Sequence, residues 1–220
     1  MRRSKSGHEG AGESGVECRL YVDLDDVLCE TMRGFLRLLA DTLGKRIAYR
    51  DVFSFDLQRS FCLTPLEAER FFEACHAPEV LIQLTPAQFA AGILADWRHA
   101  GHCVTIVTGR PPHTRIVTQE WLKLNKMPYS ELLFVDKYGR HPEIMPLKDL
   151  PLDLFTLAIE DNANVASELA RRNGPLVALL TRPWNRSGTF GASRKDQIVR
   201  CRTWKDIALV CAKVCERGLQ

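Results

Sequence analysis

Long apolar runs are missing from this sequence. No segment approaches the roughly 18 consecutive apolar residues that a membrane-spanning helix needs, so we expect no membrane span and no membrane partner. The N-terminal segment MRRSKSGHEGAGESGVE carries charge but has no apolar core, unlike a secretory signal. Its glycine, serine and charged residues predict a disordered tail over residues 1–18.

Cysteine is present, but not at the spacing of a metal cage. The eight cysteines include no C-x-x-C pair, which is the usual spacing of structural zinc ligands. Cys29, Cys75 and Cys103 lie in apolar stretches, and Cys211 and Cys215 are four residues apart in an apolar-periodic segment. We therefore interpret the cysteines as reduced, buried thiols and expect a cytoplasmic protein.

A strong excess of one charge is missing as well. The formal net charge is only +3, and much of the basic excess is local, with Arg2, Arg3 and Lys5 near the N-terminus and Arg194, Lys195, Arg200, Arg202 and Lys205 near the C-terminus. Scattered charge of this kind is typical of a solvated surface, so we do not expect a nucleic-acid partner. The 220 residues are 45% hydrophobic and 26% charged, which is ordinary for one globular domain with a small insert.

Short apolar strands alternate with amphipathic helices along the chain. The apolar stretches predict strands at 20–24, 103–108, 131–135, 154–159 and 176–180, and periodic stretches predict helices at 28–43, 64–75, 85–101, 113–125, 163–172 and 204–214. Wholly apolar strands that alternate with helices are typical of a parallel sheet covered on both faces. The sequence therefore predicts a Rossmann-like α/β fold.

Two helices have clear start signals. Thr64, Pro65 and Glu67 in TPLE form the pattern of a capping box with proline at the first helical position. Thr85 and Pro86 predict a second capped start, for the helix at 85–101.

Residues 29–84 contain helical patterns but no convincing strand, so they interrupt the alternation. We interpret this segment as an inserted helical subdomain. The α/β core then consists of residues 19–28 and 85–220.

Polar residues follow each of the first four predicted strands. Those residues are Asp23 and Asp25, then Thr108, Gly109 and Arg110, then Lys137, and finally Glu160 and Asp161. Because sites in open parallel sheets form beyond the carboxyl ends of the strands, these side chains are expected to converge. Each motif alone has an ordinary alternative, such as a turn, a helix cap or a solvated lysine. Together they supply a nucleophile, an acid, phosphate-binding groups and a magnesium site.

These motifs resemble those of the haloacid dehalogenase-like (HAD) phosphohydrolase superfamily. The D-x-D-x-[TV] motif matches Asp23-Leu24-Asp25-Asp26-Val27, and the later motifs match Thr108 in IVTGR, Lys137 in FVDKYGR and the acidic pair in AIEDN. The resemblance covers most of residues 19–181 and extends to the helical insert, which resembles a type-1 cap. Within the superfamily, DLDDVLCET, VDKYGR and RPWN resemble the 5'-deoxyribonucleotidase group and its bacterial relatives.

The resemblance implies a magnesium-dependent phosphomonoester hydrolase that acts on a small phosphorylated substrate, with a nucleoside monophosphate as the favoured one. It implies that Asp23 attacks phosphorus and that Asp25 transfers protons, for which crowded carboxylates would raise the pKa of Asp25. Substrate binding falls to Thr108, Gly109, Arg110 and Lys137. The implied Mg²⁺ ligands are Asp23, the backbone carbonyl of Asp25, and Asp161, with Glu160 supporting them.

Several alternatives stay open at this stage. Lys148 is a second candidate for the phosphate-binding lysine, and Asp26 has the options of a helix cap or a hydrogen-bonding support. Phe53, Phe55 and Phe61 either stack on a nucleobase or form the core of the insert.

The reaction also has alternatives. A phosphatase or phosphomutase on another small metabolite has the same motif residues. A non-catalytic binding relative would be expected to have lost Asp23, Asp25 or Asp161, all of which are present. Trp184 and Arg182, in the RPWN segment after the fifth strand, belong either to the edge of the site or to a surface loop.

Overall fold

A single parallel sheet forms the centre of the computed structural model, which describes residues 17–171, 173–186 and 196–217. Within these residues six strands are hydrogen-bonded in the order β3-β2-β1-β4-β5-β6. The strands are β1 (Arg19–Val22), β2 (Cys103–Thr108), β3 (Glu131–Phe134), β4 (Leu157–Glu160), β5 (Leu176–Leu180) and β6 (Ile198–Cys201). The predicted parallel α/β sheet is confirmed, and β6 is an additional edge strand.

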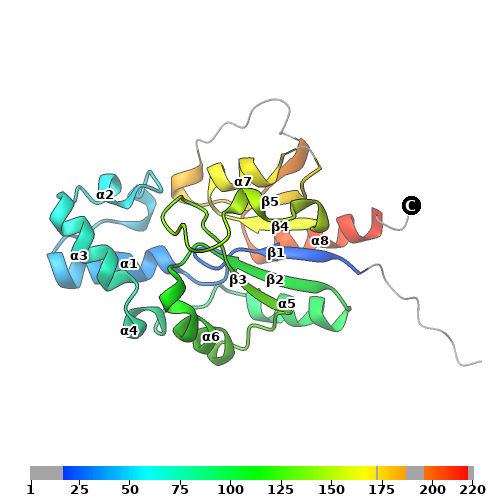
Figure 1. Cartoon of the computed structure of the whole chain (residues 1–220), viewed down its shortest axis with the longest axis horizontal. Coiled ribbons are helices and arrows are strands. Elements are labelled where there is room, and N and C mark those ends of the chain that lie inside the picture. Colours follow the sequence, from blue (N-terminus) through cyan, green and yellow to red (C-terminus); the bar gives the residue numbers. More distant parts are fainter. Residues whose placement is uncertain (1–16, 172, 187–195, 218–220) are drawn as a thin grey trace, which may run out of the picture.

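Helices cover both faces of this sheet (Figure 1). The helices are α1 (Thr31–Leu43), α2 (Leu57–Ser60), α3 (Pro65–Cys75), α4 (Pro78–Leu81), α5 (Ala90–His99), α6 (Arg115–Leu124), α7 (Ala163–Leu169) and α8 (Trp204–Arg217). Leu20 and Val22 of β1 pack in one core cluster with α5, α6 and α8, whereas Tyr21 packs in a second cluster with α7. Alternate strand residues thus face opposite layers.

Helices α1, α2 and α3 form a separate lobe at the left of Figure 1. This lobe has its own buried cluster, consisting of Met32, Phe35, Leu39, Val52, Phe61, Leu63, Ala68, Phe71 and Cys75, with Trp184 of the core packed against it. The helical cap is therefore present. Its extent over residues 29–84 stays a prediction, because Leu81 and Leu84 pack with the main core.

The predicted start of α3 is confirmed. The Thr64 side chain accepts a hydrogen bond from Glu67 N, the Glu67 carboxylate accepts one from Thr64 N, and Pro65 is the first helical residue. Local signals were sufficient here because every partner lies within three residues.

The predicted helix at 85–101 is wrong at its beginning, because α5 starts at Ala90. Residues 85–87 instead pair with the segment that leads into the cap. Glu30 N donates to Thr85 O at 2.8 Å, and Ala87 N donates to Leu28 O at 2.7 Å. These hydrogen bonds hold the two connections between cap and core side by side. Residues 85–87 therefore pair with residues 28–30 instead of beginning the helix as the local capping pattern predicts.

The interpretation of all cysteines as reduced thiols is wrong for one pair, because Cys18 and Cys215 form a disulfide across 197 residues. The parallel sheet brings the beginning of β1 beside the end of α8, which residue spacing alone does not reveal. The tail predicted over residues 1–18 falls mainly on residues 1–16, which lie outside the described part.

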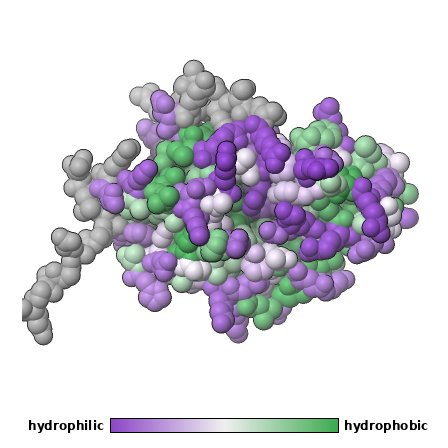
Figure 2. Space-filling model, turned by 180° about the vertical axis from the view of Figure 1, so that it is seen from behind, coloured by the Kyte–Doolittle hydropathy of each residue, from purple (hydrophilic) through white to green (hydrophobic). Residues whose placement is uncertain are grey.

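In the described part of the chain, no helix combines the length and the apolar character required to cross a membrane. The face shown in Figure 2 is largely hydrophilic, with hydrophobic side chains in scattered patches.

Candidate active site

The segments that follow β1, β3 and β4 meet at the carboxyl edge of the sheet, next to the cap. Asp23 follows β1 directly, and its backbone N–H donates to Ile159 O of β4 at 3.0 Å. Lys137 lies three residues beyond β3, while Glu160 ends β4 and Asp161 follows it. The predicted convergence of these side chains is thus present in the structure.

Lys137 lies between two buried carboxylates. Its Nζ is 2.7 Å from Asp23 Oδ1 and 2.6 Å from Glu160 Oε1. Burial disfavours the charged lysine, but the Coulombic attraction of Asp23 and Glu160 outweighs it and raises the pKa of Lys137 well above its usual value. The lysine is therefore a fixed positive charge beside Asp23 and Glu160.

Glu160 uses both of its carboxylate oxygens within the protein. Oε1 accepts from Lys137 and from the Tyr21 hydroxyl, while Oε2 accepts from the backbone N–H groups of Asp161 and Asn162. A carboxylate so fully engaged is suited to hold its neighbours in place. This agrees with a supporting role for Glu160.

Carboxylate oxygens of Asp23, Glu160 and Asp161 lie within 4.8 Å of one another. Burial, followed by repulsion from Glu160, raises the pKa of Asp23 to about 8 and that of Asp161 well above its usual range. Trp184 Nε1 donates to Asp161 Oδ2 at 2.8 Å. Among the hydrogen bonds of the described residues, Asp23 Oδ2 and Asp161 Oδ1 have none, so hard oxygen donors are left for a cation such as Mg²⁺.

Asp25 is paired with Arg110 rather than with the other acids. Arg110 Nη2 donates to Asp25 Oδ1 at 2.7 Å, Arg110 Nε donates to Oδ2 at 3.0 Å, and the Thr31 hydroxyl donates to Oδ1 at 2.6 Å. Burial acts to raise the pKa of Asp25, but Arg110 outweighs it and lowers the pKa. The expectation that crowding raises the pKa of Asp25 is wrong in this arrangement, because the sequence did not reveal its arginine partner.

Asp26 caps the first cap helix. Its carboxylate accepts from Met32 N, in the first turn of α1, at 3.1 Å. Its backbone has a φ of 55°, and Arg182 Nε donates to its carbonyl oxygen at 2.9 Å. The structure thus favours the helix-cap interpretation of Asp26.

The remaining predicted substrate-binding residues lie differently from one another. Gly109 and Arg110 line the cavity between cap and core. Thr108 is fully buried and is not one of the described residues that line this cavity. The Thr108 hydroxyl accepts from Arg110 N at 3.2 Å. A Cβ at Gly109 would lie 2.9 Å from Tyr138 Cε2 and 3.3 Å from Lys137 Cδ, so glycine allows the lysine segment to pack closely.

The two candidate lysines are separated by the fold. Lys137 lies in the carboxylate cluster and lines the cavity, whereas Lys148 lies in a short 3₁₀ turn and is exposed. Position at the site therefore favours Lys137.

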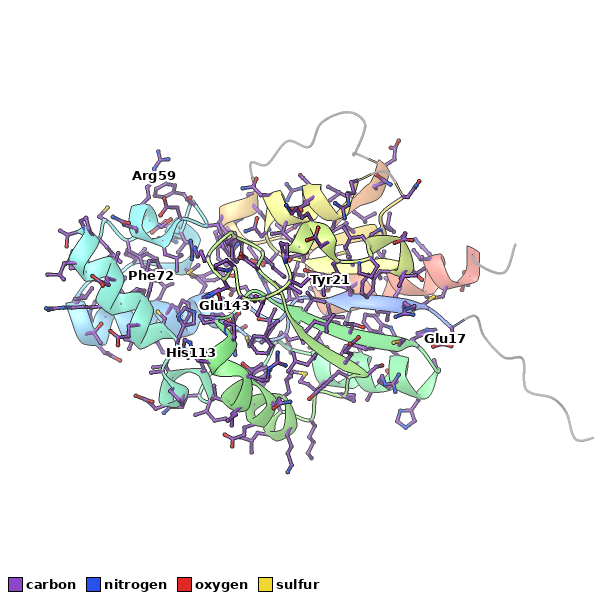
Figure 3. All side chains as sticks on the ribbon, viewed as in Figure 1. Glu17, Tyr21, Arg59, Phe72, His113 and Glu143 are labelled. Atoms are coloured by element: carbon purple, nitrogen blue, oxygen red, sulfur yellow. A yellow bond between two sulfur atoms is a disulfide. The ribbon has the colours of Figure 1, made fainter. Side chains whose placement is uncertain are left out.

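A cavity of about 1240 Å³ lies between the cap and the carboxyl edge of the sheet. Its aromatic wall includes Phe53 and Phe55 from the cap and Tyr138 from the core, with the Phe55 and Tyr138 ring centres 5.5 Å apart. Phe61, by contrast, is buried in the cap core. Figure 3 shows Phe72, another lining residue, on the cap side and Tyr21 on the sheet side.

Sequence reasoning missed some contacts of the site. The hydrogen bond from Tyr21 to Glu160 had no signal beyond the position of Tyr21 in the strand before Asp23. The sequence leaves Trp184 either at the edge of the site or in a surface loop, and in the structure its Nε1 donates a hydrogen bond to Asp161 Oδ2.

Solved structures with the same fold are HAD-like proteins. A predicted phosphoglycolate phosphatase from Haemophilus somnus 129PT is 19% identical with a TM-score of 0.59, over 89% of this chain and 98% of its own. A HAD family hydrolase from Deinococcus radiodurans R1, with bound phosphate and sodium, is 17% identical with a TM-score of 0.54, over 90% and 97%. A haloacid dehalogenase-like protein of unknown function from Agrobacterium tumefaciens str. C58 is 16% identical with a TM-score of 0.58, over 90% and 99%.

No protein-family model matches the sequence, and no curated protein does. The likeness is therefore one of fold. The chain has the Rossmann-like α/β fold with a helical cap that HAD-like hydrolases share.

Proposed function

We propose that this protein is a HAD-type phosphomonoester hydrolase that acts through an aspartyl-phosphate and uses Mg²⁺. The observation that carries the proposal is the ion-paired contact of 2.7 Å between Asp23 and Lys137, beside Asp161, at the floor of the cavity under the cap. A buried carboxylate beside a fixed cation can approach an anionic phosphate that a lone carboxylate would repel.

Asp23, the Asp25 carbonyl and Asp161 are the proposed Mg²⁺ ligands. The free oxygens Asp23 Oδ2 and Asp161 Oδ1 suit a hard cation, and Glu160 and Trp184 hold the surrounding groups. When bound, the ion would neutralise the acidic cluster and screen the charge of the substrate phosphate.

The reaction would then proceed in two steps, the formation and the hydrolysis of the aspartyl-phosphate. In the first, an Asp23 oxygen bonds to phosphorus, the P–O ester bond breaks, and the departing alkoxide takes a proton from Asp25. In the second, water attacks phosphorus, Asp25 takes the water proton, and inorganic phosphate leaves as the Asp23–phosphorus bond breaks. Lys137 balances the charge on the transferring oxygens.

The pairing of Asp25 with Arg110 bears on these steps. An ionised Asp25 beside Arg110 is in the form that accepts a proton from water. For the first step Asp25 must carry a proton, so we propose that substrate binding loosens its pairing with Arg110.

A nucleoside monophosphate is the proposed substrate class. Phe53, Phe55 and Tyr138 are exposed aromatic residues in the cavity wall that could contact a base, and the cavity of about 1240 Å³ exceeds the volume of a small metabolite site. Sugar phosphates and other small phosphomonoesters are the alternative class, and a phosphomutase is the alternative reaction.

The test is phosphate release from a panel of phosphomonoesters, with and without Mg²⁺. The panel holds ribo- and deoxyribonucleoside monophosphates, sugar phosphates and phosphoglycolate. The variants are Asp23→Asn, which keeps the shape of the nucleophile, and Lys148→Ala as a control outside the site. We expect Mg²⁺-dependent release from nucleotides in the wild type and Lys148→Ala, with about a 10⁴-fold loss or more in Asp23→Asn.

Other outcomes separate the levels of the proposal. Release from sugar phosphates alone would contradict the nucleotide proposal but not the hydrolase proposal. Phosphoryl transfer between sugar positions without release of phosphate would indicate a mutase. Equal activity of Asp23→Asn and wild type would overturn the mechanism.

A further inference from the structure

A second cluster of metal-binding side chains lies at the edge of the sheet opposite the carboxylate site. Donor atoms of Cys18, His102 and Cys215 lie within 4.8 Å of one another. Cys18 precedes β1, His102 precedes β2, and Cys215 lies in the last turn of α8. Figure 3 shows Glu17, the residue before Cys18, at the end of the sheet far from the cap.

A further cysteine, Cys211, contacts one member of this group, although it does not lie within 4.8 Å of all three. Cys211 and Cys215 are four residues apart on α8, so they share a face of the helix, and their sulfur atoms are 3.9 Å apart. Two sulfurs bound at about 2.3 Å to one tetrahedral zinc ion are about 3.8 Å apart. The α8 pair therefore already has the separation of two ligands on one ion.

His102 is suited to be a ligand in this position. Its Nδ1 accepts a hydrogen bond from Cys18 N at 3.3 Å, so the ring lies beside the cysteine segment. Coordination through Nδ1 would replace this hydrogen bond with a bond to the metal.

We propose that Cys18, His102, Cys211 and Cys215 form a structural zinc site when the Cys18–Cys215 disulfide is reduced. Three cysteines and one histidine are a common tetrahedral donor set for zinc. The disulfide engages two of the four donors, while His102 accepts a hydrogen bond from Cys18 N and the Cys211 sulfur lies beside that of Cys215. A zinc ion would engage all four.

The disulfide form and the zinc-bound form exclude each other, because both use the sulfur atoms of Cys18 and Cys215. Reduction of the disulfide converts the first form into one that can bind zinc. A dithiol reductant supplies two electrons and two protons, which break the S–S bond and give two thiols, while the dithiol becomes a disulfide. Zn²⁺ then displaces the thiol protons as it binds.

Both the disulfide and the zinc ion would link the start of β1 to the end of α8, and zinc would add the start of β2 through His102. The zinc ion would thus keep these segments linked under reducing conditions, in which the disulfide is broken. This proposal is independent of the phosphatase proposal, because none of the four residues lines the cavity under the cap.

The test measures zinc in full-length protein that has been reduced with a dithiol and exchanged into a Zn²⁺-containing, then a metal-free, buffer. We expect one tightly held zinc ion per chain by elemental analysis. Co²⁺ in its place should give the thiolate charge-transfer bands and strong ligand-field bands of a tetrahedral sulfur site. The double variant Cys18→Ser/Cys215→Ser should lose the ion and the bands, and Cys211→Ser and His102→Ala should bind zinc at least about tenfold more weakly.

Two controls separate this site from other zinc binding. Cys62→Ser removes an exposed thiol away from the cluster and should leave the zinc content unchanged. Asp23→Asn alters the carboxylate site and should also leave the cobalt–thiolate bands unchanged. Circular dichroism checks that each variant is folded.

The proposal is overturned if reduced, folded wild type retains no zinc, or if the retained ion survives in the Cys18→Ser/Cys215→Ser variant. Unchanged zinc affinity in Cys211→Ser would overturn the assignment of the fourth ligand.

Discussion

At the scale of single residues, the site depends on how buried charges are compensated. Asp23, Glu160 and Asp161 are acids in one buried cluster, and Lys137 is the cation that contacts two of them. A buried charge without a partner is costly. Lys137 therefore serves both the folding of the site and the proposed chemistry.

Replacing this lysine tests its role against the exposed alternative. Lys137→Ala should lower kcat/KM for phosphate release by about 10²- to 10³-fold, because it removes a fixed charge from the transferring oxygens. Lys148→Ala should have no effect, since Lys148 is exposed and outside the cavity. Steady-state kinetics on the best substrate measure both, and a large loss in Lys148→Ala alone would reverse the choice.

The raised pKa of Asp23 predicts how stability depends on pH in metal-free protein. Burial and Glu160 raise this pKa from 3.8 to about 8, so between these values the folded state binds a proton that the unfolded state lacks. Stability should therefore fall as pH rises through this window. Asp26, whose pKa burial raises to about 7, acts with the same sign. Urea unfolding at several pH values measures the trend.

Mg²⁺ should oppose this trend, because it replaces the bound proton. The increase in melting temperature caused by Mg²⁺ should be larger near pH 8 than near pH 5. In Asp23→Asn the slope of stability against pH should be smaller and the Mg²⁺ effect weaker. A metal-free protein whose stability rises from pH 5 to 8 would contradict the assignment.

At the scale of elements, close backbone packing at helix ends limits which side chains are tolerated. A Cβ at Gly174 would lie 2.1 Å from Leu169 O at the end of α7, a backbone atom that has little freedom to move. Gly92 lies inside α5 and would meet nothing within 4 Å. A side chain at position 174 would therefore clash with the backbone, whereas a side chain at position 92 has room.

Alanine at each position makes a matched pair. Gly174→Ala should destabilise the protein by about 1–3 kcal/mol, because the α7 terminus must shift. Gly92→Ala should stabilise it by about 0.5–1 kcal/mol, because alanine is the better helix former. Urea unfolding midpoints measure both, and equal effects of the same sign would contradict the packing argument.

At the scale of the whole molecule, the cap and the core each contribute one wall of the cavity. The cap contributes Phe53 and Phe55, and the core contributes Tyr138 and the charged floor. The backbone pairing of residues 28–30 with 85–87 holds the two connections of the cap together. Under the proposed function, the cap residues would contact the leaving group and the core residues would carry out the chemistry.

This division predicts a selective effect in the cap. Phe55→Ala should raise KM for nucleoside monophosphates by about tenfold, the value of one lost aromatic contact, while kcat for a small phosphomonoester stays within about twofold. Leu66→Ala, an exposed cap position outside the cavity, is the control. Equal losses on both kinds of substrate would assign Phe55 to cap folding instead of base binding.

Local sequence patterns were sufficient to predict the layered α/β fold, the capped start of α3 and the strand ends that carry the acids and the lysine. These features depend on local periodicity, on capping partners three residues apart, and on the rule that parallel strands end at one edge. Each is a property of neighbouring residues or of chain order. Asp23, Lys137 and Asp161 could therefore be predicted to meet.

Which side chains pair across large sequence separations could be seen only in the three-dimensional structure. The Arg110 contact that lowers the pKa of Asp25, the Trp184 contact with Asp161 and the meeting of Cys18 with Cys215 all join segments far apart in the chain. The late start of α5 has the same origin, because residues 85–87 pair with the cap connection. Such contacts depend on how layers pack, and no local pattern encodes that packing.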